Sequence, residues 1–324
     1  MPRLRLTIAV GDYDLTAGLV EGTIVPDGVE PIVLTMHSPE RHWRMLRHEE
    51  FDVAELSMSS YLVARSRGLP FIAIPVFPHR RFRHSYIFVR AGSKVERPAD
   101  LKGGRVGLRE FQNTAALWVR GILEEHYGLA VTSVTWMCQD EEDVPFTPPP
   151  GLRLERVPKN RTVDEMLRKG ELDAVIYPEL LSSFKRGSPE VRRLFTDAKQ
   201  EEIAYFRKTG IFPIMHTVVL KEALWRECPW VAANVLKAFQ QAKELAYARL
   251  QDPRRVALAW VRELLEEQRE ILGPDPWPYD LPANRPTLET LIRYSHQQGL
   301  IPKPFVLEEL FAPNTIGEGP VGFV

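Results

Sequence analysis

The stretch Ala99–Gly107 (ADLKGGRVG) decides the fold class, because it brings the chain into a strand that is followed by a helix. Arg105–Leu108 has the character of a short buried strand, and the apolar spacing predicts a helix over Thr114–Tyr127. A second stretch, Gly170–Ala174 (GELDA), again leads into a strand. Strands and helices that alternate in this way predict an α/β protein with mostly parallel sheets.

The same alternation extends to both sides of these two stretches. On the N-terminal side the pattern predicts strands over Leu4–Val10, Phe51–Leu56, Phe71–Phe77 and Ser85–Arg90, and helices over Pro39–His48, capped by Ser38, and Ser59–Ser66. On the C-terminal side it predicts a strand over Ile211–Leu220 and helices over Val163–Lys169, Pro229–Leu250, Pro253–Leu272 and Thr287–Gln298.

Composition excludes several classes of protein. The 324 residues suggest two domains, and 42 Lys and Arg against 43 Asp and Glu give a net charge of −1, which argues against nucleic acid as a partner. Two distant cysteines, Cys138 and Cys228, form neither a disulfide framework nor a zinc motif. No apolar run reaches the roughly 18 residues of a membrane span, and the N-terminal run is too short for a signal peptide, so a cytoplasmic protein is expected.

Both quoted stretches resemble the type-2 periplasmic-binding-protein fold. The resemblance implies two lobes, each a mostly parallel sheet flanked by helices, joined by two crossing strands with the ligand in the cleft between the lobes. The crossings would lie near Tyr86–Arg90 and Ile211–Val219. Lobe I would then comprise residues 1–90 and 212–324, and lobe II residues 91–211.

A closer resemblance is carried by short motifs spread over nearly the whole chain. They are GDYD (11–14), FDVAELS (51–57), IPVFP (74–78), FRHS (82–85), TGIFPIMHT (209–217), WPY (277–279) and RYSHQQG (293–299). Together they resemble the 4,5-dihydroxyphthalate decarboxylase family. The segment 138–150 and the tail after Pro313 match nothing in that pattern. The resemblance implies an enzyme that converts 4,5-dihydroxyphthalate to protocatechuate and CO₂.

The chemistry of that reaction sets requirements for the site. Protonation of the ring carbon that bears the carboxylate, with loss of the proton of the para hydroxyl, gives a keto intermediate that expels CO₂. This route needs no organic electron sink, so no cofactor is expected. It needs cations for two carboxylates, an acid at the ring carbon and a base at the phenol. No protein-built metal site is expected, although a divalent ion bridged by the catechol stays open.

Three residues are candidates for proton transfer. His216 lies on a strand expected to cross between the lobes, and His84 lies in a basic segment; an imidazole titrates near neutral pH and suits either role. Glu110 is the alternative acid if burial raises its pKa. A single histidine in an apolar strand is also typical of a hydrogen-bonded core residue, and that interpretation of His216 stays open.

Candidate substrate-binding residues come from both expected lobes. The resemblance favours Arg80 and Arg83 as carboxylate clamps, and leaves His79 and Arg81 as surface residues. Polar residues near helix starts and strand ends can meet an anion or a hydroxyl, or can simply cap local backbone. The binding candidates of this kind are Asp12, Tyr13, Ser57, Ser59, Ser60, Gln112, Thr114 and Thr217.

Two other functions remain open at this point. The first is a solute-binding protein for an aromatic carboxylate or a related small anion, which would bind its ligand without turnover. The second is another enzyme on the same scaffold, such as a menaquinone-pathway dehydratase or a pyrimidine synthase. The expected partner is a small aromatic dicarboxylate, with no membrane partner, and a homo-oligomer is possible.

Overall fold

The computed structural model describes residues 3–317, and the chain folds into two compact units. Unit 1 combines the chain up to Arg80 with Ile214–Glu289 and the part from Phe305 onward. Unit 2 combines Arg81–Pro213 with Thr290–Pro304, so it also receives a short stretch of the C-terminal part. The sequence-based lobe boundaries at 90/91 and 211/212 stay a prediction.

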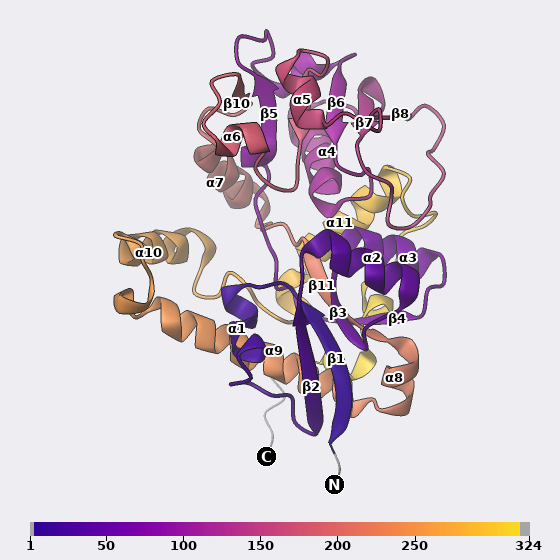
Figure 1. Ribbon diagram of the computed structural model, residues 1–324, viewed down its shortest axis with the longest axis vertical. Helices are drawn as coiled ribbons and strands as arrows, with labels where there is room; N and C mark the ends of the chain where they lie inside the picture. The colour runs from indigo at the N-terminus through magenta and orange to yellow at the C-terminus, as the bar shows by residue number, and fades with distance from the viewer. Residues whose placement is uncertain (1–2, 318–324) are drawn as a thin grey trace. The chain divides into compact units, whose positions relative to one another are not determined.

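The sheet of unit 1 has the strand order β2-β1-β3-β11-β4 (Figure 1). Its strands are β1 (Leu4–Val10), β2 (Val29–Thr35), β3 (Val53–Ser57), β4 (Phe71–Ile74) and β11 (His216–Lys221). β1 is parallel to β2 and β3, whereas β11 runs antiparallel to both β3 and β4. The register places His216 opposite Ser57, at the end of β3 where the chain turns into the next helix.

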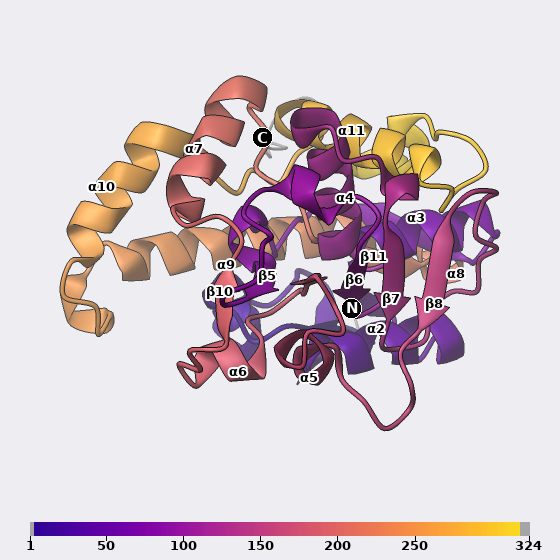
Figure 2. The ribbon, with the colours of Figure 1, turned by 90° about the horizontal axis from the view of Figure 1, so that it is seen from above.

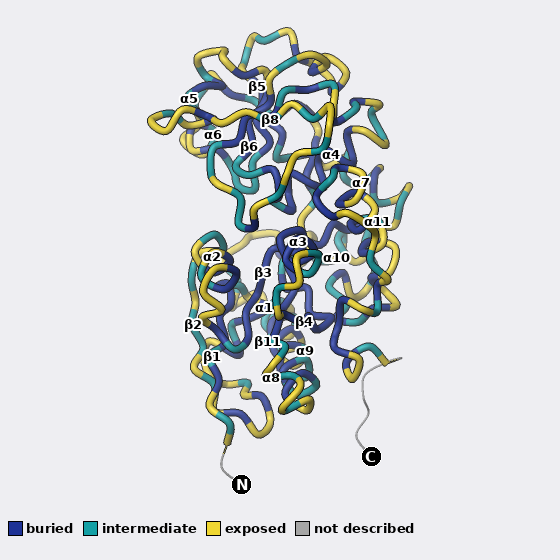
Figure 3. Tube along the Cα trace, turned by 90° about the vertical axis from the view of Figure 1, so that its right-hand side faces the viewer, coloured by how far each residue is buried: buried dark blue, intermediate teal, exposed yellow. Residues whose placement is uncertain are grey.

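Unit 1 also contains several helices. They are α1 (Asp14–Val20), α2 (Ser38–His48), α3 (Met58–Ser66), α8 (Glu222–Glu227), α9 (Trp230–Leu250) and α10 (Val261–Leu272), and α11 (Arg285–Gln297) begins in this unit. α9 packs against α1, where a Cβ on Gly18 would meet Ile24 at 2.9 Å and Leu245 at 3.1 Å. The residues of β3 and β4 are all buried, as the dark blue trace in Figure 3 shows.

The sheet of unit 2 has the order β10-β5-β9-β6-β7-β8. Its strands are β5 (Ile87–Arg90), β6 (Arg105–Leu108), β7 (Thr135–Cys138), β8 (Arg153–Arg156), β9 (Ala174–Ile176) and β10 (Val191–Arg193). β9, β6, β7 and β8 are parallel, and Figure 2 shows the last three side by side. β5 is antiparallel to both of its neighbours, so each unit contains a mixed sheet.

The helices of unit 2 are α4 (Thr114–Tyr127), α5 (Val163–Arg168), α6 (Ser182–Lys185) and α7 (Ala198–Thr209), with the rest of α11. The predicted bounds of α4 are confirmed. Asn113 Oδ1 accepts a hydrogen bond from the N–H of Ala115 at 3.0 Å and caps the helix. Gly128 ends it at φ 68°, a left-handed conformation that glycine adopts without strain.

Several predicted strands are shorter than expected, and prolines explain two of them. The strand predicted over Ser85–Arg90 begins at Ile87, after a 3-10 turn over His84–Tyr86. The strand predicted over Phe71–Phe77 ends at Ile74, because Pro75 has no N–H for the ladder. The strand predicted over Ile211–Leu220 begins only at His216, after Pro213. His216 is therefore the first residue of β11 and not a residue in the middle of a strand.

The helix predictions also need correction at several places. The helix predicted over Pro253–Leu272 begins at Val261, and Pro253–Arg255 forms a separate 3-10 turn. Ser38, the predicted cap, is the first helical residue of α2, and His37 takes the cap position. The elements that were not predicted are α1, α6, α7, α8, β2, β7, β8 and β10. No helix among residues 3–317 has the length and apolar character needed to cross a membrane.

Candidate functional site

A buried carboxylate, that of Glu55, lies at the centre of a hydrogen-bond network in unit 1. It is fully buried on β3, between β1 and β11. Its partners are the guanidinium of Arg41 (3.0 Å), the hydroxyl of Tyr13 (2.9 Å), the backbone N–H of Gly11 (2.8 Å) and Nδ1 of His216. One carboxylate thus joins β3 to three other segments of the chain, which are the connection between β1 and α1, helix α2 and strand β11.

The local fold brings these partners to Glu55. Gly11 directly follows β1, which pairs with β3, so its N–H reaches the neighbouring strand. Arg41 lies on α2 and is held by two backbone carbonyls, with Nε donating to the Glu55 carbonyl at 3.0 Å and Nη1 to that of Met36 at 2.7 Å. The guanidinium is therefore fixed in position and presents Nη2 to the Glu55 carboxylate.

The electrostatics of the network keep Glu55 ionised. Burial alone would raise the pKa of Glu55, but the charges of Arg41 and His216, with the hydrogen bonds from His216 and Gly11, hold that pKa below its ordinary range. Burial, followed by the Glu55 charge, raises the pKa of Tyr13 well above its ordinary value. Tyr13 is therefore a neutral hydrogen-bond donor to an anionic acceptor.

His216 is oriented by this carboxylate. The bond between Nδ1 and the buried Glu55 carboxylate fixes the orientation of the ring. Two further imidazoles pack edge-on against its ring, His42 with centroids 4.9 Å apart and His79 at 4.6 Å. His79, which was expected at the surface, is instead half-buried and also packs against Tyr13 at 5.8 Å.

Of the three serines near the start of α3, Ser57 caps its N-terminus. Ser57 is the N-cap, and its Oγ accepts from the N–H of Ser60 at 3.3 Å and from the Ser60 hydroxyl at 3.1 Å. Ser59 is buried in the first turn. Thr217, next to His216, donates its hydroxyl to the Ile74 carbonyl at 3.2 Å. Asp12 is exposed.

Arg80 is the last residue of the first segment of unit 1 and is buried. It donates a hydrogen bond from Nη2 to Oδ1 of Asn284, and its guanidinium lies 5.7 Å from the ring centroid of Phe77. Burial lowers its pKa to about 10, so it remains a cation at neutral pH.

Glu110 lies in unit 2, just before α4. Burial and the nearby carboxylates of Asp143, Asp140 and Glu142 outweigh Arg109 and raise the pKa of Glu110 to about 8. Its carboxyl lies 3.1 Å from Nε of Arg109 and accepts from the Asn113 amide at 3.3 Å. The side chain therefore holds a proton at neutral pH, as the role of an acid requires.

The unmatched segment 138–150 packs onto the same end of α4. The Glu142 carboxylate accepts from the backbone N–H groups of Phe111 and Gln112, both at 2.8 Å. The Gln112 side chain donates to the carbonyl of Val144 and accepts from its N–H at 3.3 Å. Phe146 stacks on Phe111 with the rings 13° from parallel. Gln112 thus anchors this segment, while Thr114 is buried in the first turn of the helix.

His84 and Arg83 are buried in unit 2. Aromatic rings surround His84, those of Phe195 at 5.3 Å, Tyr205 at 5.5 Å and Tyr127 at 6.0 Å, and burial lowers its pKa to about 4. His84 is therefore neutral at physiological pH. Arg83 donates from Nη1 to the Pro178 carbonyl at 2.8 Å, and burial lowers its pKa to about 9.

Sequence reasoning missed the residues that hold His216. Glu55 and Arg41 were given no role, although Glu55 was part of the motif FDVAELS. The available signal was an acidic residue within an otherwise apolar strand, since such a residue is rarely buried unless it is paired. Among residues 3–317, no group of three or more His, Cys, Asp or Glu side chains is arranged to hold a metal ion.

Comparisons with known proteins identify the family. A 4,5-dihydroxyphthalate decarboxylase from Comamonas testosteroni is 37% identical over 325 residues, which covers 98% of this chain and 98% of that protein. The chain belongs to the 4,5-dihydroxyphthalate decarboxylase family. A member from Pseudomonas putida is 41% identical over 214 residues, covering 64% of this chain and 83% of its own length. The family that the sequence motifs predicted is confirmed.

Comparisons with solved structures show the fold of this chain. A family model for an ABC transporter, phosphonate, periplasmic substrate-binding protein matches residues 15–142. The periplasmic aliphatic sulphonate binding protein SsuA from Escherichia coli covers 96% of this chain and 98% of its own, with a TM-score of 0.58 and 14% identity. The desulfurization enzyme DSZB covers 97% of both chains, with a TM-score of 0.54 and 16% identity. The expected periplasmic-binding-protein fold is confirmed.

Proposed function

We propose that this protein decarboxylates 4,5-dihydroxyphthalate to protocatechuate and CO₂. The observation that carries the proposal is the hydrogen bond between His216 and the buried Glu55 carboxylate, in a chain that belongs to the decarboxylase family. A histidine paired in this way is suited to proton transfer, because the carboxylate fixes the ring and stabilises its protonated form.

His216 is the proposed acid for the ring carbon. Nε2 gives a proton to the carbon that bears the leaving carboxylate, while the para hydroxyl gives up its proton and becomes a carbonyl. The bond to the carboxylate carbon then breaks, CO₂ leaves, and its electron pair restores the aromatic ring. Overall, one proton replaces one carboxylate, and no electron donor or acceptor is consumed.

Glu55, Arg41 and Tyr13 act through His216 and are positioning residues. The Glu55 anion favours the imidazolium before transfer, and Arg41 keeps that anion charged inside the protein. The hydroxyl of Tyr13 donates a further hydrogen bond to the same carboxylate, which helps to fix the carboxylate plane. This arrangement supplies the preorganisation that proton transfer to a carbon atom requires.

Other residues are proposed for binding and for the second proton transfer. Arg80 and Arg83 bind the substrate carboxylates, since both are cations at neutral pH. His84 is proposed for the second proton transfer and is neutral at physiological pH, while Glu110 is protonated and is the alternative acid. The serines at α3, Asp12, Tyr13, Gln112, Thr114 and Thr217 stay predictions as contacts to the substrate.

The reaction as written uses no organic cofactor, and we propose that none is needed, because the keto intermediate itself accepts the electron pair. A divalent ion bridged by the catechol hydroxyls is compatible with the same steps. A cytoplasmic location and a homo-oligomeric state stay predictions from the sequence.

The test is to incubate the purified protein with 4,5-dihydroxyphthalate in D₂O and follow CO₂ release and product by mass spectrometry and NMR. We expect protocatechuate with one deuterium at the former carboxylate position. Binding without CO₂ release would overturn the proposal and favour a solute-binding protein. If CO₂ is released only from other dihydroxylated aromatic acids, the proposed type of reaction is retained, but 4,5-dihydroxyphthalate is not the substrate.

A further inference from the structure

The segment between α10 and α11 contains the motif Trp277-Pro-Tyr279, which the proposed mechanism does not use. The segment is tied to α9 by Lys243, whose ammonium donates to the Asp275 carboxylate at 2.5 Å and to the Trp277 carbonyl at 2.9 Å. The same ammonium lies 5.0 Å from the ring centroid of Tyr279. These contacts fix the backbone that carries Tyr279.

The hydroxyl of Tyr279 is an unusual feature of this segment. The residue is only 3% exposed, and it belongs to a hydrophobic core cluster of unit 1. Within residues 3–317, the buried hydroxyl oxygen has no hydrogen-bond partner. Leaving a buried donor unpaired destabilises a fold, and a phenylalanine would fill the same space without that cost.

The same segment also positions Arg80. Oδ1 of Asn284 accepts a hydrogen bond from the Arg80 guanidinium. Nδ2 of the same amide donates to the carbonyls of Pro278 at 2.9 Å and Asp280 at 2.7 Å. The carbonyls of the two residues on either side of Tyr279 therefore fix the side-chain amide of Asn284, and this amide in turn binds Arg80. The charges of Arg80 and Glu55 both act on Tyr279, and burial raises its pKa well above the ordinary value, so the hydroxyl stays protonated.

We propose that Tyr279 donates a hydrogen bond from its hydroxyl to an anionic oxygen of the substrate, beside Arg80, and is a substrate-binding residue of unit 1. A protonated phenol and a guanidinium together are suited to a carboxylate or a phenolate oxygen. The identity of the substrate rests on the proposed function, whereas the site itself rests on the unpaired hydroxyl and on the contacts of Asn284.

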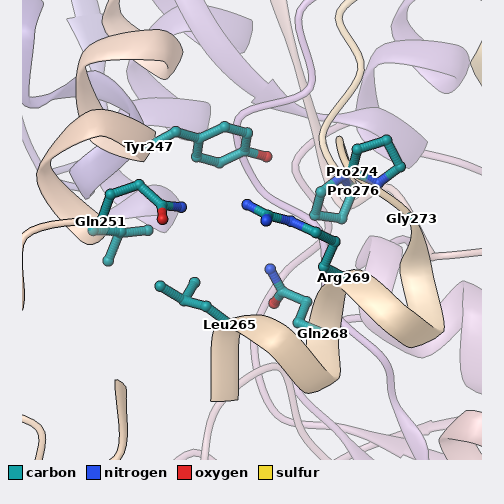
Figure 4. A pocket seen from close by; sticks show the side chains of 9 residues that line it. Tyr247, Gln251, Leu265, Gln268, Arg269, Gly273, Pro274 and Pro276 are labelled. Carbon is teal, nitrogen blue, oxygen red and sulfur yellow. The ribbon is translucent and has the colours of Figure 1, made fainter. Parts of the chain in front are cut away.

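The test compares Tyr279→Phe with a matched control, Tyr247→Phe. Tyr247 lies on α9 and donates to Asp275 at 3.2 Å, and Figure 4 shows its hydroxyl facing Arg269 across a small hollow lined by Gln251, Leu265 and Gln268. Both variants remove one phenolic oxygen from unit 1. Only Tyr279→Phe removes a group that is unpaired and adjacent to the residues that hold Arg80.

Binding of phthalate and of catechol is measured by titration calorimetry, and the melting temperature by calorimetry or circular dichroism. We expect Tyr279→Phe to bind one of the two ligands about 10- to 100-fold more weakly, at an unchanged or higher melting temperature. Weaker phthalate binding assigns the hydroxyl to a carboxylate, and weaker catechol binding assigns it to a phenol oxygen. Tyr247→Phe should leave both affinities unchanged.

Two results would overturn the proposal. One is wild-type affinity of Tyr279→Phe for both ligands, and the other is a clear fall in its melting temperature, which would show that the hydroxyl already has a structural partner. Turnover of 4,5-dihydroxyphthalate is measured separately. Absence of turnover in the wild-type protein contradicts the proposed function, whereas the binding comparison still decides the role of Tyr279.

Discussion

Nδ1 of His216 and the carboxylate of Glu55 are hydrogen-bonded inside unit 1, although 161 positions separate them in the chain. The two residues meet because β11 runs antiparallel beside β3, with His216 opposite Ser57 and Val218 opposite Glu55. The guanidinium of Arg41 forms an ion pair with the same carboxylate oxygen of Glu55, at 3.0 Å. The pair is thus fixed on two interior strands of a sheet, where side chains are held most rigidly.

Replacing Glu55 by Gln should destabilise the protein strongly. The change leaves the Arg41 guanidinium buried without its anionic partner, and breaking one side of a buried ion pair costs about 3–5 kcal/mol. Denaturant unfolding measures the effect. The control is Glu30→Gln, which breaks an exposed pair with Arg5 and should change stability little. Equal stability of the two variants would contradict the role of the buried pair.

Replacing His216 by Asn should remove proton transfer while the fold survives. General acid catalysis typically contributes about 10²–10⁴-fold, so kcat should fall by that order. Steady-state CO₂ release measures the fall, and circular dichroism checks the fold. A folded His216→Asn protein with wild-type kcat would exclude His216 as the acid and leave Glu110 or His84.

Glu110 should make stability fall as pH rises. Its folded-state pKa is about 8 because of burial and of the carboxylates of Asp143, Asp140 and Glu142, whereas an unfolded glutamate titrates near ~4.3. Between these values the folded state holds a proton that the unfolded state has lost, so the free energy of unfolding decreases with pH and levels off above about 8.

Glu110→Gln should remove this slope, which unfolding curves at several pH values between 4 and 9 can measure. The matched control is Glu141→Gln at an exposed position nearby, which should keep the slope of the wild type. A difference in stability between the wild type and Glu110→Gln that does not vary with pH would show that folding does not raise the pKa of Glu110.

Replacing Arg83 by Ala should weaken binding of a dicarboxylate but not of a neutral catechol. A hydrogen bond to a charged group contributes about 1.5–3 kcal/mol, so the affinity for phthalate should fall roughly 10- to 100-fold. The control is Arg81→Ala, because Arg81 is exposed and donates to the hydroxyl of Tyr86 at 2.9 Å. Equal losses for phthalate and catechol would assign Arg83 a structural role.

Several parts of the fold could be predicted because their signals are local. α4 has its predicted bounds because an asparagine cap and a C-terminal glycine enclose a long apolar stretch. Elements with weaker local signals were missed or misplaced. α1 has only seven residues, and β2 contains Pro31, which an edge strand tolerates. The Ile211–Met215 stretch is apolar but lies outside β11, because Pro213 interrupts strand pairing.

The sequence by itself determined the alternation of strands and helices, the family and the candidate status of His216, His84 and Glu110. Only the tertiary structure decided which residues hold His216 and whether those residues are charged or neutral. Glu55 and Arg41 are ordinary charged residues in the sequence, and their importance comes from complete burial beside each other. Burial and pairing depend on which strands become neighbours. Strand order and register are set by packing of the whole core, which no local pattern of residues contains.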